Sequence, residues 1–292
     1  MLTRRQFGLG ALALGALGFT RSSTYDYTSR DTFDLFDRVF HGSGAVGQPG
    51  DTNEHGGLAW GQSYVLLGFM RMYQAYKDTH YLDRLVENAD QVLANRDSVR
   101  GVTDHRGRSL PAWRAMHPYT VGMAVLRGGD GTPLLEVRSA LSYADDAVAT
   151  VTAGGSADRF TLEVRNNKTA KVATFTDLSL DPASADYAPR RILAAYPTPT
   201  MVTARDPRDA PAGGAIPALG PTPLASQPVI FTVHTGMITY PIAMFARTVL
   251  ADPSLWRRYK GKAVEYLAAA RAAAAVHDDE WRQTGDGRGY FV

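Results

Sequence analysis

The sequence contains no cysteine, so disulfide bonds and thiolate metal sites are excluded. Its net charge is also small: 31 Lys and Arg nearly balance 29 Asp and Glu, which gives a formal net charge of +2. Proteins that bind nucleic acid or anionic membrane surfaces usually carry a larger basic excess. No apolar run is long enough to cross a bilayer comfortably. We therefore expect no nucleic-acid partner and no stable membrane span.

The histidines lack the close spacing of a metal-binding motif. Five of them lie far apart in polar segments, with no pair in an H-x-x-x-H arrangement: His55, His105, His117, His234 and His277. Close pairs of this kind place two ligands on one face of a helix. We expect neither a metal nor another cofactor.

The N-terminus has the organisation of an export signal. Arg4 and Arg5 precede Phe7, and an uncharged run rich in Gly and Ala extends over residues 8–19. A basic region followed by a short apolar segment is typical of secretion signals, and adjacent arginines favour the twin-arginine type. Residues 1–25 are thus predicted to direct export to the periplasm, cell surface or medium through the twin-arginine (Tat) translocase. An ordinary secretory signal or a short anchor is the alternative.

Two segments are predicted to form helical hairpins. Residues 57–76 are apolar on all sides, as in a helix buried all round, whereas residues 80–94 are apolar on one face only. The short connection between them requires an antiparallel pair. The same arrangement returns in residues 234–250 and 262–281. A repeat of about 40 residues built from helical hairpins predicts a mainly α fold, an (α/α) toroid. Two hairpins do not close a ring, so we expect the toroid to be incomplete at the C-terminus and the protein to be longer.

A different pattern interrupts these repeats. Residues 159–166, "RFTLEVRN", alternate apolar and polar side chains and with residues 171–180 predict a β-hairpin. We expect a small α+β insertion over residues 128–205. A Pro- and Gly-rich linker is then expected over 206–228. The two toroid parts would occupy residues 26–127, which begin with a short amphipathic helix, and 229–292.

In such a toroid, the helix ends and their loops would bring candidate residues to one end of the ring. The predicted catalytic residues are His234, Tyr240, Asp279 and Glu280. The predicted substrate-binding residues are Glu54, His55, Trp60, Tyr64, Asp104, Arg106, Trp113, Arg114 and Trp281. Aromatic rings stack on sugar faces, and arginines pair with carboxylates or sulfates. This combination favours an acidic polysaccharide or oligosaccharide as the substrate.

The residue types leave the reaction open. Proton abstraction beside a uronate carboxylate needs a base, an acid and a cation. Hydrolysis instead needs two carboxyl groups flanking the glycosidic bond. Structural roles are also open: Trp60 and Tyr64 as core residues, Asp104 as a turn former, His234 as a buried structural histidine, and Glu54 and His55 as helix-capping residues.

Two resemblances extend this interpretation. Residues 57–93, "GLAWGQSYVLLGFMRMYQAYKDTHYLDRLVENADQVL", resemble the C-terminal domain of D-glucuronyl C5-epimerases and, more generally, six-hairpin carbohydrate-active enzymes. The resemblance implies a toroid and C5 proton abstraction by an epimerase or lyase, with a glycoside hydrolase as the alternative. Residues 159–193 resemble a segment of phage tail-sheath proteins, which implies a non-catalytic cell-envelope binding or assembly role as a further alternative.

Overall fold

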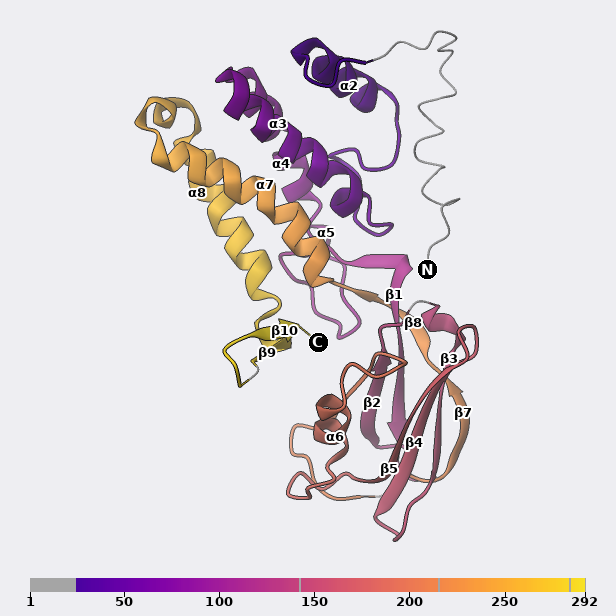
Figure 1. Ribbon diagram of the computed structural model, residues 1–292. Coiled ribbons are helices and arrows are strands. Elements are labelled where there is room, and N and C mark those ends of the chain that lie inside the picture. Colours follow the sequence, from indigo (N-terminus) through magenta and orange to yellow (C-terminus); the bar gives the residue numbers. More distant parts are fainter. Residues whose placement is uncertain (1–24, 142, 215, 284, 292) are drawn as a thin grey trace, which may run out of the picture. The chain divides into compact units, whose positions relative to one another are not determined.

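The computed structural model describes residues 25–141, 143–214, 216–283 and 285–291 (Figure 1). The predicted export signal lies outside these residues, apart from Tyr25. The chain divides into two units, one ending at Ala45 and the other beginning at Val46. Within the first unit, the predicted amphipathic helix is present as α2 (Arg30–Gly42), and the rings of Tyr25 and Phe36 lie 5.2 Å apart.

The second unit contains the two predicted helical hairpins. The first consists of a π-helical turn, η1 (Leu58–Gln62), which continues into α3 (Ser63–Tyr76) and is followed by α4 (His80–Ala94). The second consists of α7 (Thr232–Ala251) and α8 (Pro253–Ala275). The turn between α7 and α8 is tight because Asp252 caps α8, accepting from the Ser254 N–H, while Pro253 occupies the first helical position.

The two hairpins pack directly against each other. Helices α3 and α7 are in contact, and each contributes apolar side chains to the core, such as Phe69 of α3 and Phe245 of α7. On α8, the hydroxyl of Tyr259 donates to Asp83 and that of Tyr266 donates to Asp90, both over 2.7 Å. These bonds join α8 to α4, so the four helices form one group.

Between the hairpins, the chain forms a β-sandwich. One antiparallel sheet has the order β6-β2-β1-β8, from β1 (Ala115–Arg127), β2 (Pro133–Ser139), β6 (Val202–Arg205) and β8 (Ala225–Val229). The other has the order β5-β4-β3-β7, from β3 (Ala147–Ala153), β4 (Arg159–Asn166), β5 (Lys171–Ser179) and β7 (Leu219–Pro223).

The sandwich has one apolar core, to which both sheets contribute. Leu135 and Val137 of the first sheet, Leu162 and Phe175 of the second, and Ile192 of α6 (Ala188–Ala194) belong to the same buried cluster. Alternation explains the pattern along β4, where Phe160, Leu162 and Val164 are inside. Short elements complete the chain: α5 (Asp97–Arg100), the 3₁₀ turns η2 (Ala144–Asp146) and η3 (Asp278–Glu280), and the pair β9 (Trp281–Gln283) and β10 (Gly289–Phe291).

The predicted mainly α toroid is therefore wrong: the fold is mixed α and β, with three antiparallel sheets. The hairpins were recognised, but they pack on each other instead of following a ring. The sandwich also extends beyond the expected insertion, because β1 begins at Ala115, and the expected linker 206–228 contains β7 and most of β8. None of the described helices is long and apolar enough to cross a membrane.

Candidate functional site

Side-chain contacts connect the four segments that carry the predicted site residues. Glu54 accepts from Arg114 over 2.9 Å, which joins the segment before η1 to the segment before β1. The Trp60 indole donates to His234 over 3.0 Å and joins η1 to the first turn of α7. Arg106 lies 2.8 Å from Asp279, in the turn after α8. Segments far apart in the sequence thus meet where the helices adjoin the sandwich.

The first candidate site is an aromatic rim, formed by His55, Trp60, Tyr64 and Tyr119. Gly56 adopts a left-handed conformation with φ +74, and a Cβ there would lie 2.6 Å from the Tyr119 ring and 2.9 Å from Trp60. Only glycine allows both rings to lie this close to the backbone. Trp60 lies in the π-helical turn, a feature often found at functional sites. Trp60 and Tyr64 are 45% and 57% exposed, so both offer ring surface to a ligand.

His55 lies in the rim with its tautomer fixed. Its Nδ1 is 2.8 Å from the carbonyl oxygen of His117, which only accepts hydrogen bonds. In the neutral ring the proton is therefore on Nδ1, and Nε2 keeps its lone pair. His55 is exposed, and among the described residues Nε2 has no protein partner. This is the arrangement of a histidine that can take a proton from a ligand.

His234, predicted to be catalytic, lies in the core and is only 1% exposed. Trp60 donates to its Nε2, and the amide nitrogen of Asn53 lies 3.2 Å from its Nδ1. The Asn53 oxygen accepts from the Ala59 N–H. A neutral imidazole accepts at one nitrogen only, so with Nε2 accepting from Trp60 the approach of the Asn53 amide to Nδ1 is a contact and not a second donated hydrogen bond. Burial lowers the pKa of His234 to about 4. A neutral ring enclosed in this way positions Trp60 and does not exchange protons with a substrate.

Behind the rim lies a group of charged residues around Glu54. Arg100 and Arg114 both donate to Glu54, over 2.8 and 2.9 Å. Burial acts to raise the pKa of Glu54, but the hydrogen bonds and charges of the two arginines outweigh it, and the pKa is lowered. Asp97 is fully buried, and burial raises its pKa to about 7, despite the hydrogen bond from the Arg114 N–H. Near neutral pH the group therefore has an excess of positive charge.

Other predicted site residues have structural positions. Trp113 is 1% exposed and donates from its indole to the Val92 carbonyl, so it belongs to the core. Asp104 accepts from the backbone N–H groups of Arg106 and Arg108 and shapes their loop. Trp281 packs on Phe291, with ring centroids 5.0 Å apart. Tyr240 is 53% exposed on α7, although its helix was expected to be buried on all sides.

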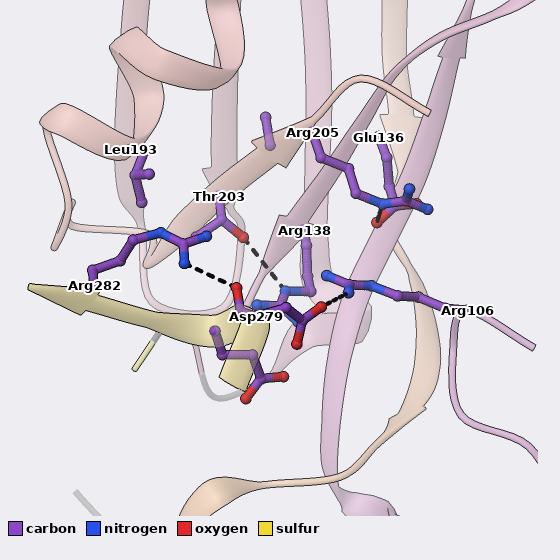
Figure 2. A pocket seen from close by; sticks show the side chains of 10 residues that line it. Arg106, Glu136, Arg138, Leu193, Thr203, Arg205, Asp279 and Arg282 are labelled. Atoms are coloured by element: carbon purple, nitrogen blue, oxygen red, sulfur yellow. Dashed lines mark hydrogen bonds and ion pairs between the residues drawn. The ribbon is translucent and has the colours of Figure 1, made fainter. Parts of the chain in front are cut away.

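The second candidate site is an arginine pocket of about 510 Å³, counting its part open to solvent (Figure 2). It is lined mainly by charged side chains from the 105–108 loop, from β2 and β6, and from the turn after α8: Arg106, Glu136, Arg138, Arg205, Asp279, Glu280 and Arg282. Arg205 pairs with Glu136 through two bonds of 3.0 and 2.6 Å. Glu280 accepts from His277, and Asp279 pairs with Arg106.

Sequence reasoning placed Arg106, Asp279 and Glu280 in the candidate site but missed Glu136, Arg138 and Arg205. These three belong to β2 and β6, inside the segment that was interpreted as an insertion. A signal was present in "LLEVRS", where Glu136 and Arg138 alternate with the buried Leu135 and Val137. The two charged residues therefore share the outer face of the sheet.

Comparison with known proteins adds no assignment: no protein-family model matches the chain, and a search of curated proteins found no similar sequence. Within the described ranges, no three His, Asp or Glu side chains are grouped so as to hold a metal ion.

Proposed function

We propose that this protein is exported and acts on an acidic, uronate-containing polysaccharide by proton abstraction at C5, as an epimerase or a lyase does. The observation that carries the proposal is His55: its Nδ1 is bound to a backbone carbonyl and its Nε2 is free beside exposed aromatic rings. Trp60 and Tyr64 supply ring faces for a sugar, and His55 supplies a base.

The surroundings of His55 supply the other groups that this reaction needs. Tyr119 packs over Gly56, the residue that follows His55. The Tyr119 hydroxyl has no protein partner among the described residues, so it can act as the acid. The excess positive charge of Arg100 and Arg114 favours a uronate carboxylate nearby. A cation close to that carboxylate stabilises the negative charge that develops on it when the C5 proton leaves.

Proton abstraction is better supported than hydrolysis, because the rim lacks a pair of available carboxyl groups. A glycosidase needs one carboxyl group with a raised pKa and a second that is ionised, both facing the substrate. Glu54 is held by two arginines, and Asp97, whose pKa is raised, is fully buried. Neither can approach a glycosidic bond without leaving its partners.

The test is incubation of the full chain with glucuronate- and mannuronate-containing polymers in deuterated water. We expect deuterium at C5, detected by NMR, with or without an unsaturated product. His55→Gln should reduce the rate by about 100-fold or more, because general-base catalysis contributes at least that factor. Tyr119→Phe should slow the reaction while leaving substrate binding in place.

His80→Gln is the matched control, since His80 is an exposed histidine at the start of α4 and should leave the rate unchanged. Full activity of the His55→Gln variant would overturn the role given to His55. Binding of the polymer without isotope exchange or cleavage would overturn the enzymatic proposal and favour a non-catalytic binding protein.

A further inference from the structure

The arginine pocket has no part in the proposed reaction, and its charges are not balanced. Four arginines line it against three carboxylates, Glu136, Asp279 and Glu280. Each carboxylate already has a cationic or histidine partner. Arg205 binds Glu136 through two N–H groups on one edge of its guanidinium, Nε and Nη2, and Arg106 binds Asp279. Glu280 lies 2.6 Å from the ring of His277.

Two arginines have no carboxylate partner within the described part of the chain. Arg138 donates only to the hydroxyl of Thr203, over a long 3.4 Å. Arg282 donates to the backbone carbonyls of Asp279 and Trp281. Figure 2 shows both guanidinium groups among the side chains that line the pocket. Five N–H donors on each guanidinium require acceptors, and these two have most of theirs left.

The residues around Arg138 compensate its charge only in part. Burial lowers the pKa of the Arg138 guanidinium; the charges of Glu280 and Glu136 oppose this effect, and that of Arg106 adds to it. His105 is close enough for Arg138 to affect it, and burial together with that charge lowers the pKa of His105 to about 4. Both ring nitrogens of His105 and the Nε atom of Arg106 are buried without a protein partner. A desolvated cation in such surroundings is stabilised by a bound anion.

The lining of the pocket restricts the ligand further. Leu193 and Ala204 are its only apolar lining residues, so an apolar ligand would leave many charged groups unsatisfied. A sugar unit carrying an acidic group has the required polarity.

We infer that the arginine pocket is a second, separate binding site, which takes the anionic group of a ligand between Arg138 and Arg282. The anionic group is an oxyanion, either a carboxylate, a sulfate or a phosphate, since all three accept paired N–H bonds from guanidinium groups. This inference does not depend on the reaction proposed for His55. The pocket could be occupied even in a protein without catalytic activity.

Isothermal titration calorimetry on the full chain tests the site with inorganic sulfate, inorganic phosphate and D-glucuronate, each at constant ionic strength. We expect saturable binding of one molecule per chain. Arg138→Gln and Arg282→Gln should each weaken it about tenfold, the loss of one charge-assisted pair. Arg165→Gln is the matched control, because Arg165 is an arginine of β4 that contacts only Glu163 in the same strand. It should bind as the wild type does.

The outcomes separate the ligand sources. Tighter binding of glucuronate than of sulfate or phosphate identifies a uronate unit of a glycan as the ligand, and the reverse order identifies a sulfated or phosphorylated one. Arg282→Gln keeps the test decisive if Arg138→Gln fails to fold, because Arg282 holds only backbone carbonyls of its own turn. The inference is overturned if none of the three anions binds saturably, or if the folded variants bind them as tightly as the wild type.

Discussion

Gly56 allows the aromatic rim to be tested without any assumption about the ligand. Replacement by alanine would place a methyl group 2.6 Å from the Tyr119 ring and 2.9 Å from Trp60. It would also force an alanine into a left-handed conformation at φ +74. Gly101, at the end of α5, has nearly the same conformation at φ +68, but nothing lies within 4 Å of a Cβ there. Gly101→Ala therefore measures the backbone cost alone.

The two costs can be estimated separately. An L-residue in the left-handed region costs roughly 1–2 kcal/mol, and both variants lose this amount. Overpacking against a ring adds roughly 1–3 kcal/mol, because Tyr119 must shift or leave its position. We therefore expect Gly56→Ala to lower the free energy of unfolding by about 2–5 kcal/mol, and Gly101→Ala by about 1–2 kcal/mol.

Urea unfolding monitored by circular dichroism provides the measurement. A double variant, Gly56→Ala with Tyr119→Ala, should recover most of the overpacking cost, because the ring that collides with the methyl group is absent. Equal losses in Gly56→Ala and Gly101→Ala would refute the close approach of Tyr119 and Trp60 to residue 56, as would a double variant in which the two losses simply add.

Three further predictions concern buried polar groups. His234 has an ordinary pKa of 6.5 in the unfolded chain and a pKa of about 4 in the folded protein, so between these pH values only the unfolded chain takes up a proton. On acidification from pH 7 to 4, the free energy of unfolding of the wild type should therefore fall by about 3 kcal/mol relative to His234→Gln, measured by urea unfolding. Asp97 has the opposite effect, because its pKa is about 7 in the folded protein and 3.8 in the unfolded chain, so the unfolded chain releases its proton first as the pH rises. From pH 4 to 8, the free energy of unfolding of the wild type should fall by up to about 4 kcal/mol relative to Asp97→Asn. Tyr266→Phe should lower the midpoint of thermal unfolding through a loss of about 1.5 kcal/mol in stability, because the buried hydroxyl donates to the charged Asp90. Lys262 also pairs with Asp90, but this ion pair is partly exposed, so Lys262→Ala should cost less than about 1 kcal/mol.

The helices could be read from the sequence because their signals are local. Residues 80–94 alternate apolar and polar faces with helical spacing, and α4 spans His80–Ala94 as predicted. The same holds for the β-hairpin of residues 159–166 and 171–179, whose alternation sets both strands. The arrangement of the hairpins was not local information. Two apolar helical hairpins can pack on each other or on successive neighbours in a ring. The choice depends on contacts between distant segments, such as that of Tyr266 with Asp90.

The sandwich was underestimated for a related reason. Its first and last strands along the sequence are β1 and β8. They pair with each other although roughly a hundred residues separate them, as in Gly122 with Ser226. The Pro- and Gly-rich composition of residues 206–228 favoured a linker, yet β7 and β8 lie there, and each pairs with a strand of a different sheet. Strand pairing satisfies backbone groups irrespective of side chains, so composition alone does not exclude it.

The candidate site was predicted in its parts but not in its roles. The sequence indicated that Glu54, Trp60, His234 and Asp279 would come together. Contacts join the segments that carry them, but Asp279 lines the arginine pocket, whereas Trp60 and His234 lie at the aromatic rim. It could not distinguish His55 from His234, because one is exposed with a free nitrogen and the other is enclosed by Trp60 and Asn53. Burial of this kind is a tertiary property.

The first turn of α7 connects the two candidate sites. His234 holds Trp60 of the aromatic rim, while its neighbour Thr235 contacts the His277 ring over 2.9 Å. His277 in turn binds Glu280, which lines the arginine pocket. An anion bound at Arg138 would change the electrostatic surroundings of Glu280, a side chain only a few contacts from Trp60. Since His234 and His277 are both almost completely buried, this path has little freedom to absorb a shift. The chain has four tryptophans, so the contribution of Trp60 is obtained by comparison with Trp60→Phe. If sulfate or glucuronate fills the pocket, the wild type and Trp60→Phe should differ in their fluorescence response. Thr235→Val keeps the shape of residue 235 but removes its contact with His277, and it should respond as Trp60→Phe does.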